Sequence, residues 1–157
     1  MKITPLHQND IPELIELMKL GEPYIRPRTT SDYWLYANLF SSTCPIARVN
    51  GHLVGAIMAF RSQERPDDIY IQDVITHPEH RRQGITSALL TAITDRATVL
   101  GARRLYLTSE PDNFAAHRTW LKRGFMNAPG DQLIDGVFVI SDFKGPGRHR
   151  AVYEKSV

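Results

Sequence analysis

The stretch on either side of Gly84 constrains the fold more than any other part of the sequence, because a strand, a loop and a helix follow one another there without a break. Ile69 to Thr76 is apolar at most positions, which predicts a strand. A polar segment follows and ends in Gly84. From Ile85 on, apolar residues recur at the spacing of one helix face, and Gly101 stands where a helix typically ends. This unit predicts an α/β protein.

The rest of the chain supplies further strands and helices in a mixed order. The pair Asn50-Gly51 predicts a two-residue hairpin turn between two strands, and Asp10 and Asn113 stand before two expected helices. The expected strands cover residues 1–6, 45–49, 53–61, 69–76, 104–108, 133–140 and 151–155, and the expected helices follow Asp10, cover 31–39 and 85–100, and run from Asn113 to Arg123. Because this order is mixed, a purely parallel doubly wound sheet is excluded.

Composition limits the class of protein. The chain has 157 residues, 42% of them hydrophobic, so we expect a single domain over 1–157 with a real core. A net charge of +2 argues against a nucleic-acid binder. The single cysteine, Cys44, excludes an internal disulfide, and no cluster has metal-ligand spacing. No apolar run approaches the length of about 20 residues that a membrane span needs, and no secretory signal is apparent, so a cytoplasmic protein is expected.

The loop before the expected helix at 85–100 has the features of an anion site. The first N–H groups of a helix have no partner within it, and the macrodipole adds about half a positive charge there. Gly84 has no side chain to hold a phosphate away from them, so a pyrophosphate is the natural ligand. The loop matches neither G-x-G-x-x-G nor G-x-x-x-x-G-K-S/T. Similar junctions with Arg and Gly also occur in α/β proteins that bind nothing there, and the sequence of the loop leaves both interpretations open.

Two motifs carry a resemblance to a known family. The run from Arg81 to Thr86 follows R/Q-x-x-G-x-G/A at Arg81 and Gly84, with Thr86 in place of the final small residue. The pattern N-x-x-A-x-x-x-Y-x-x-x-G-F appears as Asn113, Ala116, Trp120, Gly124 and Phe125, with Trp120 in place of the tyrosine. Over nearly its whole length the sequence resembles the GNAT superfamily of acyl-CoA-dependent N-acetyltransferases. The resemblance implies a mixed, mostly antiparallel sheet with about four helices and a V-shaped splay between two parallel central strands.

The resemblance also implies how acetyl-CoA would bind. The pyrophosphate would lie against backbone N–H groups of Arg82 to Ser87, and the pantetheine arm would run along the strand that ends at Thr76. Three basic residues of the last helix, Arg118, Lys122 and Arg123, would be available to the 3′-phosphate, although for any one of them a solvated helix face is the better explanation. The cofactor-binding residues expected on this basis are Val74, Ile75, Thr76, Arg81, Arg82, Gln83, Gly84, Ile85, Thr86, Ser87, Asn113, Ala116 and Trp120.

For catalysis, the resemblance places a base before the hydrophobic pair of the central strand, where this sequence has Asp73. Glu110 is the reserve candidate. A backbone N–H near Val74 or Ile75 would hold the oxyanion. An indole does not donate a proton as a phenol does, so Trp120 is expected to pack beside the cofactor. His117 is the candidate proton relay to the leaving thiolate.

The acceptor is expected to contact the segments 21–36 and 141–150. The first contains the candidate acceptor-binding residues Glu22, Tyr24, Arg26, Arg28 and Tyr33. Carboxylates with arginines suggest a small zwitterionic amine or amino acid, and a solvated loop explains them as well. The run from Phe40 to Cys44 and the triplet Pro111-Asp112-Asn113 are similar to the diaminobutyrate acetyltransferases of ectoine synthesis.

Two other functions stay open. The run from His77 to Ile85 also resembles enzymes that acetylate protein N-termini, although the segment 141–150 would leave less room for a peptide chain. Because the motif tyrosine is absent, a non-catalytic acyl-CoA-binding sensor is the alternative from another class. The partner expected on the main interpretation is a small-molecule amine, with no nucleic acid and no membrane. A homodimer is also open.

Overall fold

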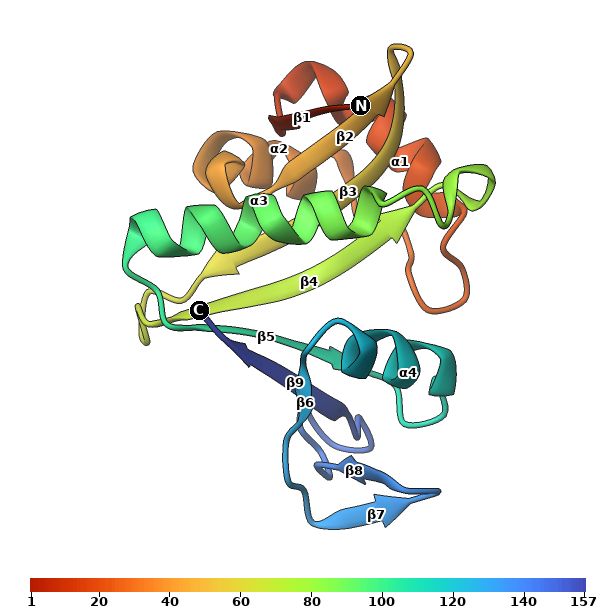
Figure 1. The fold of residues 1–157 in the computed structure, drawn as a ribbon, viewed down its shortest axis with the longest axis vertical. Coiled ribbons are helices and arrows are strands. Elements are labelled where there is room, and N and C mark those ends of the chain that lie inside the picture. The colour runs from red at the N-terminus through yellow and green to blue at the C-terminus, as the bar shows by residue number, and fades with distance from the viewer. The chain divides into compact units, whose positions relative to one another are not determined.

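The computed structural model of the protein describes residues 1–157. It contains four α-helices and nine strands, which Figure 1 labels in chain order. The contacts divide the chain into two compact units, residues 1–102 and residues 103–157. The first unit contains β1 to β4 and α1 to α3, and the second contains β5 to β9 and α4.

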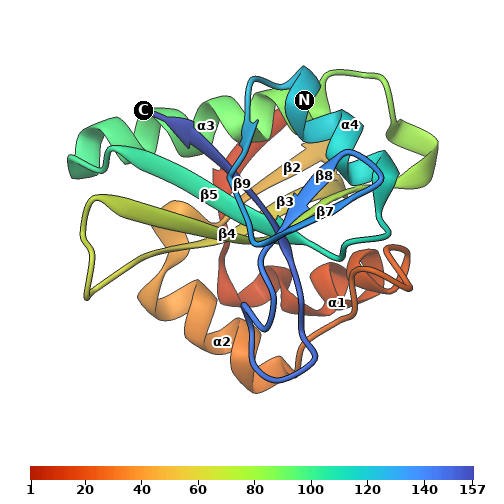
Figure 2. The ribbon, with the colours of Figure 1, turned by 90° about the horizontal axis from the view of Figure 1, so that it is seen from below.

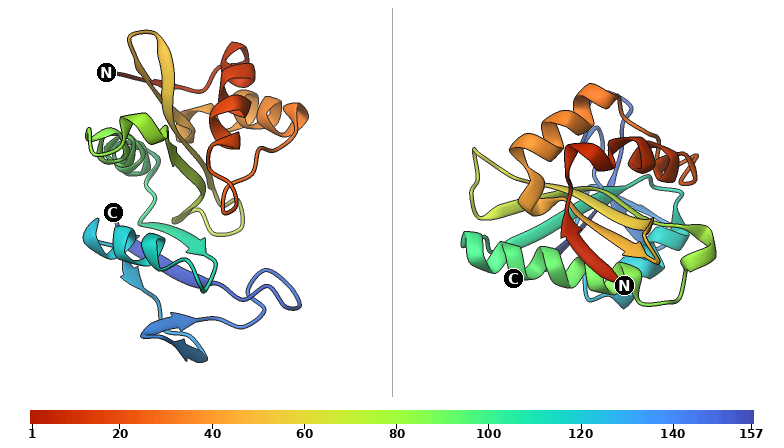
Figure 3. Two further views of the ribbon diagram at one scale, coloured as in Figure 1. Left: turned by 90° about the vertical axis from the view of Figure 1, so that its right-hand side faces the viewer. Right: turned by 90° about the horizontal axis from the view of Figure 1, so that it is seen from above.

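The first unit has an antiparallel sheet in the order β1-β2-β3-β4, between two layers of helices. Figure 2 shows α3 on one face of this sheet and α1 and α2 on the other, and Figure 3 shows the same layers from two further directions. The elements are β1 (Lys2–Pro5), α1 (Ile11–Lys19), α2 (Thr30–Leu39), β2 (Pro45–Val49), β3 (His52–Arg61), β4 (Asp68–Thr76) and α3 (Ile85–Leu100), with short 3₁₀ turns at Gln8–Asp10, Ser41–Thr43 and Pro78–His80.

Local signals in the sequence explain where these helices begin and end. The Thr29 hydroxyl caps α2 by accepting a hydrogen bond from the backbone N–H of Asp32, and the Asp32 carboxylate accepts one from the backbone N–H of Thr29. The helix α3 begins after Gly84 and ends before Gly101, and both glycines have positive φ angles, +80° and +75°. Residues with a β-carbon rarely adopt such angles, so the two glycines fix the length of α3.

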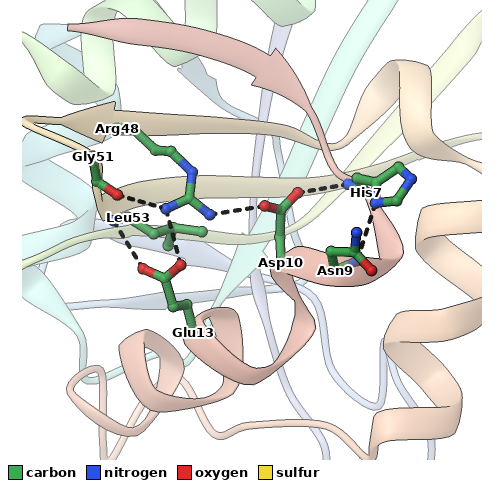
Figure 4. Close-up of polar contacts among 7 residues, drawn as sticks. All are labelled: His7, Asn9, Asp10, Glu13, Arg48, Gly51 and Leu53. Carbon is green, nitrogen blue, oxygen red and sulfur yellow. Dashed lines mark hydrogen bonds and ion pairs between the residues drawn. The ribbon is translucent and has the colours of Figure 1, made fainter.

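One arginine joins the first helix to the β2–β3 hairpin. The Arg48 guanidinium lies 2.8 Å from Asp10 Oδ1 and 2.9 Å from Glu13 Oε1, and it donates to the Gly51 carbonyl at 2.9 Å (Figure 4). Asp10 precedes α1 as the sequence predicts, but its side chain accepts from Arg48 and from the backbone N–H of His7 rather than capping α1. The start of α1 is therefore held against β2.

The second unit has an antiparallel sheet in the order β5-β9-β6, the helix α4 and a separate two-stranded hairpin. Its elements are β5 (Arg104–Ser109), α4 (Phe114–Lys122), β6 (Met126–Asn127), β7 (Gln132–Ile134), β8 (Val137–Val139) and β9 (Ala151–Ser156). Asn113 caps α4 by accepting from the backbone N–H of Ala116 at 3.1 Å. Trp120 and Phe125 are both buried, and their ring centroids lie 5.5 Å apart.

The structure confirms the mixed α/β class with four helices and mostly antiparallel pairing, and it corrects one strand. The single strand expected over 133–140 is the hairpin β7–β8, because the chain turns at Asp135 and Gly136, both with positive φ. Asp-Gly is a typical hairpin turn, so the signal was present in the sequence. The short strand β6 was not expected. The splay between the strands at 69–76 and 104–108 concerns two different units and stays a prediction, as does the single domain.

Candidate functional site

The loop between β4 and α3, residues 77–84, is called the motif loop here, and hydrogen bonds hold it at both of its ends. At the start, the backbone N–H of His77 donates to the Val54 carbonyl at 2.7 Å, and the His77 ring accepts from the backbone N–H of Glu79. At the end, the hydroxyls of Thr76 and Thr86 lie 2.9 Å apart and join the last residue of β4 to the first turn of α3. These hydrogen bonds within the protein define the conformation of the loop at its two ends.

The start of α3 has the geometry of an anion site. No side chain caps this helix, and its first N–H groups have no partner within the helix. A β-carbon on Gly84 would meet no atom within 4 Å, so the space around this residue at the helix start is open. The residues present therefore fit the pyrophosphate of coenzyme A. The Thr86 hydroxyl is engaged by the Thr76 hydroxyl.

The side chains of Arg81, Arg82 and Gln83 are exposed around this helix start. Arg82 has a φ of +62°, which is uncommon for a residue with a β-carbon, and it precedes the turn at Gly84. The Gln83 amide oxygen lies 3.3 Å from Nδ1 of His80. Two exposed positive charges thus stand next to the uncapped end of the helix, where they favour an anionic ligand.

Asp73 lies on β4, three residues before the strand ends, and its carboxylate is buried with 6% of the side chain exposed. Its Oδ1 lies 3.6 Å from Nη2 of Arg28, which comes from the segment between α1 and α2. Burying a carboxylate costs free energy unless an opposite charge accompanies it, and Arg28 supplies that charge. The structure therefore brings together the predicted base and one of the predicted acceptor-binding residues.

A second polar residue of β4 reaches the same arginine. With its amide oxygen turned toward Arg28, Gln72 accepts from Nε at 3.1 Å and from Nη2 at 3.3 Å, and also from the Tyr36 hydroxyl at 3.2 Å. This orientation gives all three donors a partner. The backbone N–H of Arg28 donates to the Tyr33 hydroxyl at 2.9 Å. Arg28 is thus held through its backbone and through its side chain.

The other predicted acceptor-binding residues are in different environments. Glu22, Tyr24 and Arg26 are exposed on the segment between α1 and α2, and their side chains make no hydrogen bond or ion pair. Tyr33 is fully buried, and burial raises its pKa to about 12. Its hydroxyl positions Arg28 and has no exposed surface for an acceptor.

Val74 and Ile75 lie on β4 and Ile85 and Ser87 in the first turn of α3, and the second unit contains Asn113, Ala116, His117 and Trp120. Ala116 follows the helix cap Asn113, and Trp120 is 9% exposed beside Phe125. Nδ1 of His117 lies 2.7 Å from the hydroxyl of Tyr153, a buried residue of β9. Burial also raises the pKa of Tyr153, which keeps its hydroxyl protonated next to the imidazole.

Three of the residues just described were not predicted from the sequence. Gln72 had a signal, since it stands with Asp73 as a polar pair inside an otherwise apolar strand. Tyr36 belongs to an aromatic helix in which nothing local separates core residues from site residues. Tyr153 had no signal, because its partner His117 comes from another element of the second unit.

Two further observations bear on the class of protein. No group of three or more His, Cys, Asp or Glu side chains is arranged to hold a metal ion. Each of the helices is too short or too polar to span a lipid bilayer. The site is therefore built from backbone N–H groups, two arginines on the motif loop, and the polar group around Asp73.

Comparison with known proteins places the chain in a family. Residues 11–125 match the sequence profile of the acetyltransferase (GNAT) family. The match takes in more than half of the chain, so the protein belongs to this family. The family predicted from the two motifs is confirmed, and with it the class of acetyltransferases.

Two curated sequence relatives are both diaminobutyric acid acetyltransferases. L-2,4-diaminobutyric acid acetyltransferase from Nocardia farcinica is 32% identical over 84 residues, 54% of this chain and 44% of that protein. The protein of the same name from Marinococcus halophilus is 30% identical over 90 residues, 57% of this chain and 52% of that protein. The chain thus spans about half the length of the curated relatives it matches.

Solved structures share the fold. Diaminobutyrate acetyltransferase from Paenibacillus lautus, solved with L-2,4-diaminobutyric acid and coenzyme A, gives a TM-score of 0.75 at 24% identity, with 97% of this chain and 93% of that chain covered. Ard1 from Thermoplasma volcanium gives 0.78 at 18% identity, with 99% and 97% covered. At these identities the likeness concerns the fold alone.

Proposed function

We propose that this protein is an acetyl-CoA-dependent N-acetyltransferase that acts on the primary amine of a small molecule with a carboxylate, in the manner of a diamino acid. The observation that carries this proposal is the pairing of Arg28 with the buried Asp73 at 3.6 Å on the first unit. A cation and an anion held side by side complement an acceptor that has both charges. The sequence relatives named as diaminobutyric acid acetyltransferases support the same substrate class.

The motif loop would hold the coenzyme. Backbone N–H groups at the start of α3 would accept the pyrophosphate, with Arg81 and Arg82 beside it. The last residues of β4, Val74 to Thr76, would bind the pantetheine arm through their backbone. Within the second unit, Asn113, Ala116 and Trp120 are the residues that we propose for coenzyme binding. When bound, acetyl-CoA supplies the acetyl group as a thioester, and the chain has to orient it and stabilise charge.

Asp73 is the proposed base. An aliphatic amine is protonated near neutral pH, so its ammonium must lose a proton before nitrogen attacks the carbonyl carbon. The Asp73 carboxylate would bind that ammonium and accept the proton directly or through water. A backbone N–H at Val74 or Ile75 would stabilise the oxyanion. The His117 imidazole, hydrogen-bonded to Tyr153, would return a proton to the leaving thiolate.

Arg28 is the proposed partner of the acceptor carboxylate. Its side chain is 42% exposed, and its hydrogen bonds and ion pair involve Nε and Nη2 rather than Nη1. A guanidinium binds a carboxylate with two N–H groups when its edge is accessible. With the carboxylate on Arg28 and the ammonium on Asp73, one amine of the acceptor would be selected for acetylation.

The proposal is tested by measuring thiol release from acetyl-CoA with a panel of acceptors: L-2,4-diaminobutyrate, other amino acids, simple diamines and a short peptide with a free N-terminus. We expect turnover with a diamino acid and saturable binding of coenzyme A in calorimetry. Turnover only with the peptide would favour a protein N-acetyltransferase instead. Binding of coenzyme A without turnover on any amine would favour the sensor.

A further inference from the structure

The strand β4 contains an irregularity at the acceptor site. Along the pairing of β3 with β4, Met58 is opposite Asp73 and Ala59 is opposite Ile71, so Gln72 has no opposite residue. This is a β-bulge with the extra residue on β4. In a regular strand Gln72 and Asp73 would point to opposite faces of the sheet. Here both side chains reach the guanidinium of Arg28.

The hydrogen bonds determine which edge of Arg28 stays accessible. A guanidinium has five N–H groups, one on Nε and two on each Nη. Gln72 accepts from Nε and from Nη2, and Asp73 lies 3.6 Å from Nη2. Nη1 has no protein partner. The protein side of the guanidinium is therefore occupied, and the remaining N–H groups face away from Gln72.

Tyr36 fixes the Gln72 amide in turn. Its hydroxyl lies 3.2 Å from the amide, and burial raises the pKa of Tyr36, so the hydroxyl stays protonated and is a donor over the working range of pH. Because a guanidinium only donates, Arg28 requires the amide oxygen on its side, and the Tyr36 hydroxyl then donates to the same oxygen. Gln72 is also neutral, so it orients Arg28 without cancelling its charge.

We infer that Gln72 is a positioning residue that sets the preference of this enzyme for acceptors with a carboxylate, by holding Arg28 with its Nη1 edge available. This inference rests on the proposed function. It goes beyond that function because it assigns acceptor selectivity to the bulge residue, which touches neither acceptor nor coenzyme. Tyr36 contributes through Gln72, and its effect is correspondingly smaller.

The test compares two acceptors that differ by one group. L-2,4-diaminobutyrate and 1,3-diaminopropane have the same spacing between their amines, and only the first has a carboxylate. For Gln72→Leu and Gln72→Glu we expect the ratio of kcat/KM between the two acceptors to fall at least tenfold, through a higher KM for diaminobutyrate. Gln72→Glu keeps the shape and adds a charge that neutralises Arg28. Tyr36→Phe should lower the ratio by a smaller factor.

The control is Gln63→Leu, the same substitution at an exposed position of the turn between β3 and β4, which should leave the ratio and the activity unchanged. A purely structural role of Gln72 would reduce kcat/KM for both acceptors equally, and that result would overturn the inference. If Gln72 variants do not fold, an unchanged ratio in Tyr36→Phe overturns it as well.

A second readout separates this inference from the proposed function. Acceptor binding is measured by calorimetry with coenzyme A present, which needs no turnover. A wild-type protein that acetylates neither acceptor contradicts the proposed function. If it still binds diaminobutyrate more tightly than diaminopropane, and Gln72→Leu abolishes that difference, the positioning role stands. Equal binding of both acceptors by the wild type contradicts the positioning role.

Discussion

Asp73 is the one charged side chain among the buried residues of the protein. A carboxylate in that position costs several kcal/mol if nothing compensates it, and a strand at the centre of a core has no structural need for one. The chain compensates Asp73 with an arginine from the segment between α1 and α2 and surrounds that arginine with Gln72, Tyr33 and Tyr36. Such an arrangement is expected where the charge itself is used.

Asp73→Asn keeps the shape of the side chain and removes the base. We expect kcat to fall by about 10²–10⁴-fold, the usual contribution of a positioned base, while the affinity for coenzyme A stays unchanged. Steady-state kinetics with diaminobutyrate and calorimetry with coenzyme A measure the two effects. The matched control is Asp67→Asn in the exposed turn before β4, which should have wild-type kinetics. An unaffected kcat in Asp73→Asn would move the role of base to another group.

The sequence predicted the individual residues of the site better than their contacts. Asp73 and Arg28 were both singled out, but their pairing depends on how β4 and the segment after α1 pack, which no local pattern specifies. The bulge at Gln72 depends on the register between β3 and β4, and register is a property of the paired strands. For the same reason Tyr33 was expected to touch the acceptor, although the fold buries it completely.

At the scale of elements, α3 offers a matched pair of glycines for testing the anion site. Gly84 and Gly101 stand at its two ends with nearly equal φ, and a β-carbon on either would meet open space. Gly84→Ala and Gly101→Ala should each lower the free energy of unfolding by about 1–2 kcal/mol, the cost of a left-handed conformation in an L-residue. Chemical denaturation measures this cost.

Only Gly84→Ala should also weaken coenzyme A binding. Its new methyl group would stand in front of the uncapped N–H groups, and we expect about a tenfold loss of affinity, equivalent to about 1.4 kcal/mol. Gly101→Ala should bind coenzyme A as the wild type does. Equal affinities in the two variants would show that the start of α3 does not hold the pyrophosphate.

Arg48 connects α1 to β2 and to the hairpin turn through three contacts of its guanidinium, with two carboxylates and one carbonyl. Arg48→Met should lower the free energy of unfolding by about 1–2 kcal/mol, because the partly buried Asp10 carboxylate would lose its charged donor. Lys19→Met is the control, since the Lys19–Glu16 pair is exposed on both sides and should change stability by less than about 0.5 kcal/mol. Similar losses in both variants would mean that Arg48 acts as an ordinary surface charge.

Elements with strong local signals were predicted almost to the residue. The hairpin at Asn50-Gly51 and the helix between Gly84 and Gly101 are stabilised by turn and cap residues that favour the same local conformation in most proteins. The prediction of a single strand over 133–140 is wrong, because the apolar residues on the two sides of Asp135-Gly136 belong to two strands of a hairpin. The two-residue strand β6 exists only through its pairing with β9, so nothing in its own sequence predicts it.

At the scale of the whole molecule, the family was predictable because its two motifs lie in different elements and each has a separate physical role. One motif forms the uncapped start of α3, and the other forms the cap and the buried aromatic pair of α4. Agreement of two such signals in one chain is much more specific than either alone. The acceptor is less predictable, because the contacts proposed to select it, such as that of Arg28 with Gln72, depend on how separate elements pack.

Two buried weakly acidic groups of the first unit make its free energy of unfolding fall as the pH becomes alkaline. Burial raises the pKa of the Cys44 thiol from 9.0 to about 12 and that of the Tyr33 hydroxyl from 10.0 to about 12, and both side chains belong to the same core. In the unfolded chain these groups lose their protons near their ordinary values, whereas the folded chain retains them. The stabilisation from both groups is therefore complete below about pH 9 and is lost as pH rises toward 12.

We expect the free energy of unfolding, measured by urea denaturation at constant ionic strength, to be level up to about pH 9. Above that it should fall by about 1.4 kcal/mol per pH unit for each proton that only the folded state retains. Cys44 ionises first in the unfolded chain, so Cys44→Ala should delay the onset toward pH 10, where Tyr33 takes over. The Cys44 thiol also donates to the Ala59 carbonyl at 3.5 Å, a contact that exists only while the thiol is protonated. A free energy that stays level to pH 11 would show that neither group is held neutral by the core.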